Sequence, residues 1–243
     1  SSMQAYPSSL MGCIALIKQT FLDAEWYHNS NEDKQKNLSL EAFTSTQSLP
    51  QIFEVRNKYS VLRADKIGDE YNLQYIFKGS GDEYQLLEEI KGTNGKLIVP
   101  LNFPKAYDVE DPYDARNVSL EEMKHWELAP SNPKFLEENQ FVFALTADGL
   151  ENKADFLKNL RKAVKRGLSK PQALKSLTQV PAEMMGIYTE LGSLALGKQA
   201  NFIITSGDVF EEGESIHQNW IKGQKHEIST LDLVDIRGVY NLN

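Results

Sequence analysis

The fold is decided by residues 73–101, which read LQYIFKGSGDEYQLLEEIKGTNGKLIVPL. Two short apolar runs, 73–78 and 96–101, flank a segment near 83–90 that has the composition of a helix. Short apolar strands that alternate with helices are typical of right-handed βαβ units in a parallel sheet. The stretch therefore predicts two neighbouring parallel strands joined by a crossover helix.

The same alternation continues on both sides of this unit. Upstream, residues 51–55 (QIFEV) predict a strand, and a helix follows near 60–69. Downstream, residues 141–146 (FVFALT) predict a fourth strand, followed by a helix over 153–165. Between the third and fourth strands lies a long proline-rich connection, 102–139, and a connection of this length often has a functional role. One helix near 120–126 is expected to interrupt it, with Ser119 as N-cap and Glu122 completing a capping box.

The two ends of the chain follow other patterns. Apolar residues at helical spacing predict a long amphipathic helix over 9–28, with Cys13 on its apolar side as a buried, inert thiol. From Gly192 the pattern changes to short β runs, which are 201–205, 216–222 and 225–228, and the tail 231–243 alternates like one more strand.

Composition excludes several classes of function. The formal net charge is -8, with 26 Lys and Arg against 34 Asp and Glu. The chain therefore lacks the excess of positive charge that attracts nucleic-acid phosphates. No apolar run approaches the roughly 20 residues of a membrane span, since the run from Leu10 is broken by Lys18. A single cysteine forms no internal disulfide and no cysteine-rich zinc site.

Residues 167–205 read GLSKPQALKSLTQVPAEMMGIYTELGSLALGKQANFIIT and are followed by NWIKG. This stretch resembles the C-terminal signature of the amidohydrolase superfamily, although Asn201 stands where that family usually has Asp. Residues 6–27 (YPSSLMGCIALIKQTFLDAEWY) are similar to a stretch of large bacterial proteins that resemble imidazolonepropionase.

The resemblance implies an α/β fold, a partial (β/α)₈ TIM-barrel-like domain with a small C-terminal β-element. We expect residues 1–190 to form the C-terminal half of the barrel and residues 191–243 to form part of the attached β-sandwich. Four strands do not close a barrel that needs eight, so an N-terminal half-barrel or a second copy of the chain is the expected partner, and an oligomer is expected. Similar bacterial proteins are often exported, which implies a periplasmic location, although Ser1-Ser2-Met3 does not open a signal peptide.

The resemblance also implies chemistry. In this superfamily histidines, a lysine or glutamate and an aspartate hold zinc or another divalent metal, which activates water for hydrolysis of C–N bonds in cyclic amides. The four histidines here are His28, His125, His217 and His226, and none forms a His-x-His pair. Two hypotheses stay open. The chain is a metal-dependent hydrolase whose missing ligands lie elsewhere, or it is an inactive barrel scaffold that binds a small molecule or a partner.

Three residues match the family's ligand positions. Glu54 and Lys78 stand where histidines follow the fifth and sixth strands, and Asp148 stands at the aspartate position after the eighth, as a metal ligand or water-activating base. The alternatives are a turn residue for Asp148 and a salt bridge that replaces the metal for Glu54 and Lys78. We expect the three charges to converge in a buried, paired cluster in a cleft walled by residues 102–139, where Lys78→Met costs a few kcal/mol.

Two further features give weaker evidence of a function. His125 is either a catalytic group of the long connection or a solvated helix residue. Gly79-Ser80-Gly81 is a short glycine-rich turn that lacks the Gly-Lys-Ser/Thr of a phosphate loop.

Overall fold

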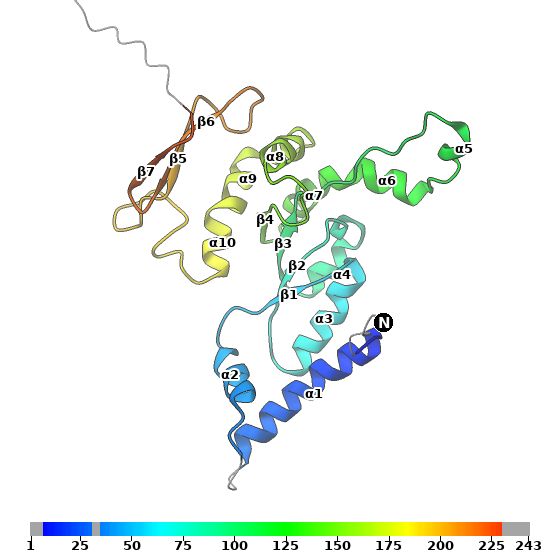
Figure 1. Cartoon of the computed structure of the whole chain (residues 1–243), viewed down its shortest axis with the longest axis vertical. Coiled ribbons are helices and arrows are strands. Elements are labelled where there is room, and N and C mark those ends of the chain that lie inside the picture. Colours follow the sequence, from blue (N-terminus) through cyan, green and yellow to red (C-terminus); the bar gives the residue numbers. More distant parts are fainter. Residues whose placement is uncertain (1–6, 31–34, 230–243) are drawn as a thin grey trace, which may run out of the picture.

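A four-stranded parallel sheet forms the centre of the molecule. The computed structural model describes residues 7–30 and 35–229. The strands are β1 (Ile52–Glu54), β2 (Ile76–Lys78), β3 (Lys96–Pro100) and β4 (Phe143–Thr146), and they lie side by side in chain order. All three strand pairs are parallel, so the prediction of successive βαβ units is confirmed (Figure 1).

The two faces of this sheet are covered unequally. Outward-facing residues such as Phe77, Leu97 and Phe143 are fully buried in the main core. That core is completed by α3 (Lys58–Glu70), α4 (Leu87–Gly92), α7 (Asn132–Glu138), α8 (Asp155–Lys165) and α9 (Lys170–Leu177). The inner face has only a small cluster, in which Ile76 and Ala144 pack against Val180 and Met184 of α10 (Gln179–Met184). A parallel sheet normally has both faces covered, so this inner face is that of an incomplete barrel.

The connection between β3 and β4 contains more helix than its prolines suggest. It holds α5 (Pro112–Ala115), α6 (Leu120–Leu128) and α7, and the part with α5 and α6 projects sideways from the sheet (Figure 1). The predicted capping box of α6 is confirmed, because Ser119 and Glu122 exchange hydrogen bonds. Pro133 lies in the first turn of α7, where its missing N–H costs nothing, so a helix forms where the sequence predicted a loop.

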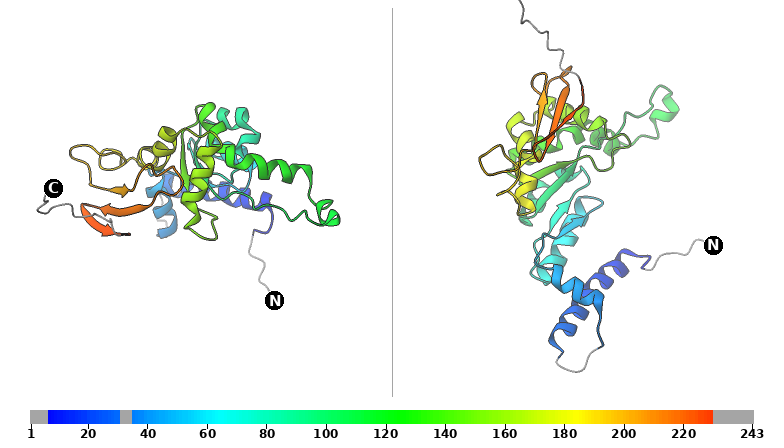
Figure 2. Two further views of the ribbon diagram at one scale, coloured as in Figure 1. Left: turned by 90° about the horizontal axis from the view of Figure 1, so that it is seen from above. Right: turned by 60° about the vertical axis from the view of Figure 1, so that its left-hand side comes forward.

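Two helices precede the sheet and lie below it (Figures 1 and 2). The predicted amino-terminal helix is present as α1 (Leu10–Asn29), and the side chain of its N-cap Ser9 accepts a hydrogen bond from Gly12 N. The helix α2 (Leu38–Thr46) was not predicted; Phe43 of α2 packs edge-on against Phe21 of α1. The prediction of a buried Cys13 is wrong, since Cys13 is exposed. No helix in the described ranges is long and apolar enough to cross a bilayer.

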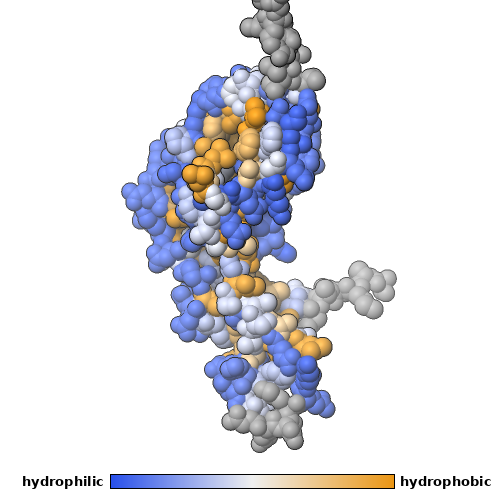
Figure 3. Space-filling model, turned by 90° about the vertical axis from the view of Figure 1, so that its left-hand side faces the viewer, coloured by the Kyte–Doolittle hydropathy of each residue, from blue (hydrophilic) through white to orange (hydrophobic). Residues whose placement is uncertain are grey.

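A small antiparallel sheet follows α10. It consists of β5 (Phe202–Thr205), β6 (Ile216–Ile221) and β7 (Gln224–Glu227), as the sequence predicted. Figure 3 shows apolar side chains gathered on this part of the surface, and the exposed ones include Leu194, Leu196, Ile203, Ile204 and Ile221. The predicted strand over 231–243 lies outside the described residues.

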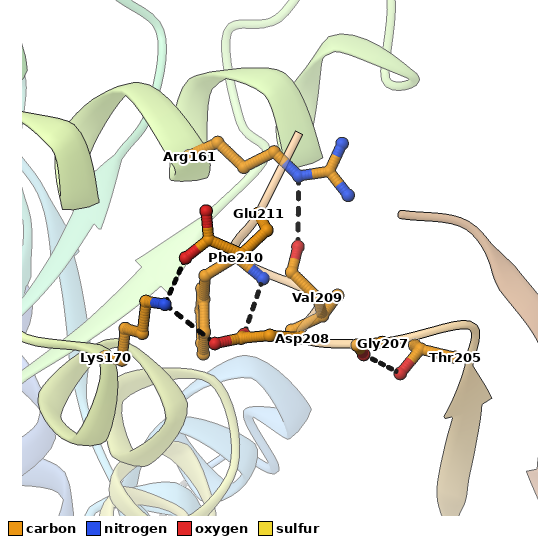
Figure 4. A network of polar contacts seen from close by, with 8 residues as sticks. All are labelled: Arg161, Lys170, Thr205, Gly207, Asp208, Val209, Phe210 and Glu211. Carbon is orange, nitrogen blue, oxygen red and sulfur yellow. Dashed lines mark hydrogen bonds and ion pairs between the residues drawn. The ribbon is translucent and has the colours of Figure 1, made fainter. Parts of the chain in front are cut away.

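The loop between β5 and β6 fastens the small sheet to the half-barrel (Figure 4). Lys170 Nζ lies 2.8 Å from Asp208 Oδ2 and also pairs with Glu211, while Arg161 Nε donates to the carbonyl oxygen of Val209 at 3.0 Å. Between these contacts Phe210 enters the main core and is only 8% exposed. The loop therefore belongs to the packing of α8 and α9, and the boundary expected after residue 190 stays a prediction.

Candidate functional site

Two of the predicted site residues end neighbouring strands. Glu54 is the last residue of β1 and Lys78 the last of β2, and the two stand opposite each other in the parallel register. Asp148 follows β4, where its N–H donates to Thr146 Oγ1 at 3.2 Å. Because carboxyl ends of parallel strands share one edge of a sheet, the three side chains start from the same edge.

The three charged groups meet around the ammonium of Lys78. Lys78 Nζ lies 2.8 Å from Asp148 Oδ2 and 3.2 Å from Glu54 Oε2. The hydrogen bond from Lys78 holds the pKa of Asp148 below its ordinary value, and the bond to Asp148 in turn raises the pKa of Lys78. The predicted convergence of Glu54, Lys78 and Asp148 is confirmed, and we call these three residues the Lys78 cluster.

The surroundings of the Lys78 cluster differ from the prediction in two ways. The side chain of Lys78 is 22% exposed, that of Asp148 52% and that of Glu54 72%, so the expected burial is wrong. Solvent screens exposed pairs strongly, and the large stability cost expected for Lys78→Met no longer follows. The groove beside the cluster is lined by residues 102–106 and 149–151, but none of the three charged residues lines it.

The fit of a divalent metal to the Lys78 cluster is poor. The donor set is two carboxylates around an ammonium, and that cation fills the place between the oxygens where a metal ion would lie. In the described parts of the chain no three His, Cys, Asp or Glu residues group closely enough to hold a metal. The expected role of Asp148 as a metal ligand therefore stays untested, and this arrangement gives it no partners of the needed kind.

The glycine-rich turn after Lys78 binds a carboxylate of the chain itself. Glu83 Oε1 accepts hydrogen bonds from the N–H groups of Ser80 at 2.7 Å and Gly81 at 3.0 Å. A Cβ on Gly79 would lie 2.1 Å from the same oxygen, which explains the glycine. The N–H groups of this turn are therefore occupied by Glu83, in keeping with the absence of a phosphate-loop signature at residues 79–81. Sequence reasoning missed Glu83 because its only signal was a glycine-rich turn shortly before an acidic residue.

His125 belongs to a different part of the surface. Its Nδ1 lies 3.1 Å from the hydroxyl oxygen of Tyr84, and the two rings stack with centroids 6.0 Å apart. The contact joins α6 to the short 3₁₀ turn Glu83–Gln85. His125 is thus half-buried against Tyr84.

The architecture has relatives among solved structures. An amidohydrolase from Thermotoga maritima MSB8 matches with a TM-score of 0.73 at 19% identity, covering 90% of this chain and 56% of that chain. A Xaa-Pro dipeptidase with bound methionine matches with a TM-score of 0.55 at 15% identity, covering 78% and 47%. A prolidase complexed with N-methylphosphonate-L-proline gives 0.53 at 16% identity, covering 72% and 44%.

The extent of these matches bears on the fold. The chain spans about half the length of the solved structures it resembles, which agrees with four strands of a barrel that has eight. No curated protein is significantly similar to the chain. The model of the amidohydrolase family matches residues 28–226, which include the whole parallel sheet and all but the last residue of the small antiparallel sheet. The chain therefore belongs to the amidohydrolase family, and it contains part of that family's barrel together with a small C-terminal sheet.

Proposed function

We propose that this chain is a scaffold form of the amidohydrolase barrel, which binds a partner and does not hydrolyse C–N bonds by itself. The observation that carries the proposal is the ammonium of Lys78 between the carboxylates of Asp148 and Glu54. A lysine at this place satisfies both acids without a metal. Positive charge on Lys78 also repels a divalent cation from the same oxygens.

The proposed partner is the missing half of the barrel, from an N-terminal segment of a longer protein or from a second copy of the chain. Two observations support it. Ile52 on the outer strand β1 is 50% exposed, and among residues 7–30 and 35–229 the inner face of the sheet is covered only by the cluster around α10. An open strand edge beside an uncovered apolar face favours association.

A second candidate function is metal-dependent hydrolysis of a C–N bond in a cyclic amide, with the remaining ligands on the partner half. Asp148 favours it, because a lowered pKa keeps its carboxylate ionised at the carboxyl end of β4. In that case Lys78 would have to leave Asp148 when the two halves meet. Membership of the amidohydrolase family also supports this alternative.

Metal content and hydrolase activity of the purified chain test the proposal. We expect less than a tenth of an equivalent of zinc or manganese after dialysis against either ion, measured by inductively coupled plasma mass spectrometry. We also expect no hydrolysis of dihydrouracil or hydantoin above the buffer rate. Stoichiometric metal that is lost in Asp148→Asn but kept in Asp155→Asn would contradict the proposal and favour the hydrolase.

A further inference from the structure

A groove on the helix side of the sheet lies next to the Lys78 cluster but is separate from it. It has a volume of about 940 Å³ and lies between the segment after β3, the turn after β4 and one face of α8. A cavity of this size suits a small organic molecule. We call it the α8 groove, and its lining includes Phe103, Lys105, Trp126, Glu151, Lys158 and Lys162.

The charges of the α8 groove do not cancel within the described part of the chain. Two of its lysines have carboxylate partners, because Lys105 Nζ lies 2.8 Å from Glu151 Oε2 and Lys165 pairs with Glu212. Lys158 and Lys162 form no such ion pair among the described residues, and Asp155 is the one remaining acid of the lining. The lining therefore carries one uncompensated positive charge, in a chain whose net charge is -8.

Lys162 is the more constrained of these two lysines. It is half-buried, and its ammonium lies over the ring of Phe103, 5.7 Å from the centroid. Burial, with the neighbouring charges of Arg166 and Lys158, lowers the pKa of Lys162. Glu127, which pairs with Arg166, opposes this lowering, and an anion in the groove would relieve the remaining repulsion.

Two aromatic side chains add apolar surface to the α8 groove. Phe103 is half-buried and Trp126 is 37% exposed, and both line the groove. Glu127, the neighbour of Trp126, forms a two-point ion pair with Arg166, at 2.6 and 3.2 Å, which joins α6 to α8. The helix that carries Trp126 and the helix that carries the lysines are therefore linked beside the groove.

We propose that the α8 groove binds an aromatic monocarboxylate, with the carboxylate at Lys162 and Lys158 and the ring against Trp126 and Phe103. A single free positive charge matches a monoanion better than a phosphate dianion. Aromatic surface adds the apolar contact that an isolated carboxylate lacks. The proposal is independent of the scaffold function, because Glu54, Lys78 and Asp148 do not line this groove.

Isothermal titration calorimetry with 2-naphthoate tests the site on the full chain, in a buffer of low ionic strength. We expect one binding site, and we expect Lys162→Met to weaken binding by about tenfold, since a hydrogen bond to a charged, half-buried group is worth this much. Lys124→Met is the matched control, because Lys124 is an exposed lysine of α6 that does not line the groove. Trp126→Ala should also weaken binding, and Trp126→Phe should restore part of it.

Ligand variants separate the contributions of charge and ring. Neutral 2-naphthamide should bind about tenfold more weakly than 2-naphthoate, and acetate or inorganic phosphate should give no heat of binding at millimolar concentration. The proposal is overturned if 2-naphthoate does not bind, if naphthamide binds equally well, or if phosphate binds more tightly. It is also overturned if Lys162→Met, folded by circular dichroism, binds like the wild type. That result would place the ligand outside the α8 groove, for example in the apolar groove near Leu174 and Phe202.

Discussion

The side-chain amide of Asn132 donates a hydrogen bond of 2.6 Å to Glu83 Oε2 inside the core, where both residues are at most 1% exposed. The other amide atom, Oδ1, accepts from Tyr84 N at 2.9 Å. Burial raises the pKa of Glu83, while the N–H groups of Ser80 and Gly81 and the Asn132 amide oppose that rise. The pair joins the turn after β2, which follows Lys78, to helix α7.

Asn132→Ala should lower the free energy of unfolding by about 2 kcal/mol, because it removes a hydrogen bond from a buried acidic group. Urea unfolding followed by circular dichroism measures the difference. Asn117→Ala, at an exposed position, should change the free energy by less than about 0.5 kcal/mol. Equal stability of the two variants would show that Glu83 needs no partner from α7.

Removing Lys78 should raise the pKa of Asp148 toward its ordinary value of 3.8, because the main cause of the lowering is the hydrogen bond from Lys78. A lowered folded-state pKa contributes stability above the unfolded pKa, and this stability is lost as the pH falls through the folded pKa. The difference in stability between wild type and Lys78→Met should therefore vanish at strongly acidic pH. A carbon-13 titration of the Asp148 carboxyl group measures the shift, and Lys105→Met should leave it unchanged.

Lys78→His should create a weak zinc site, because an imidazole would then stand between the carboxylates of Glu54 and Asp148. Imidazole and carboxylate are ordinary zinc ligands, and three of them suffice for a site that is completed by water. Calorimetry with zinc chloride should show one site in Lys78→His and none in wild type. Lys105→His, at a lysine whose ion-pair partner is Glu151, is the control; zinc binding to both variants alike would rule out a specific site.

Phe210→Ala should lower the free energy of unfolding by about 3 kcal/mol, since it leaves a cavity in the main core. The same change should loosen the loop between β5 and β6, which we expect limited proteolysis to detect as faster cleavage there. Tyr113→Ala, at a side chain that is 76% exposed, is the control. Unchanged stability of Phe210→Ala would mean that Lys170 and Arg161 hold the loop without its apolar anchor.

Ile52→Lys should reduce self-association, because a charge on the outer strand β1 opposes pairing with another strand. Size-exclusion chromatography with light scattering at micromolar concentration should show an oligomer in wild type and more monomer in the variant. Leu120→Lys, at an exposed position of α6, should leave the oligomer unchanged. A monomeric wild type would contradict the expected second copy of the chain.

The strands and the Lys78 cluster were predictable because they depend on local patterns. Strand positions follow from short apolar runs, and once the strands are parallel, their register places Glu54 beside Lys78. The contact between Glu83 and Asn132 was not predictable, because it depends on how α7 packs against the turn after β2. The helix α7 itself was not predicted, because the prolines around it are typical of a loop. The predictions of burial were wrong for a similar reason. The exposure of Cys13 and of Glu54 depends on which elements pack beside them, and their own sequence does not show this.

The order of the strands sets the order in which the sheet can form. Neighbours in space are neighbours in sequence, so each strand closes a loop only onto the one before it. Leu97 and Phe143 are about twice as far apart along the chain as Ile76 and Lys96, which raises the loop-closure entropy by only ~0.6 kcal/mol. Loop closure therefore opposes the pairing of β4 slightly more than the pairing of β3. Until β4 pairs, α9 and α10 lack the strand on which they pack, and a nascent chain that ends before β4 would lack Phe143 and Leu145 of the main core.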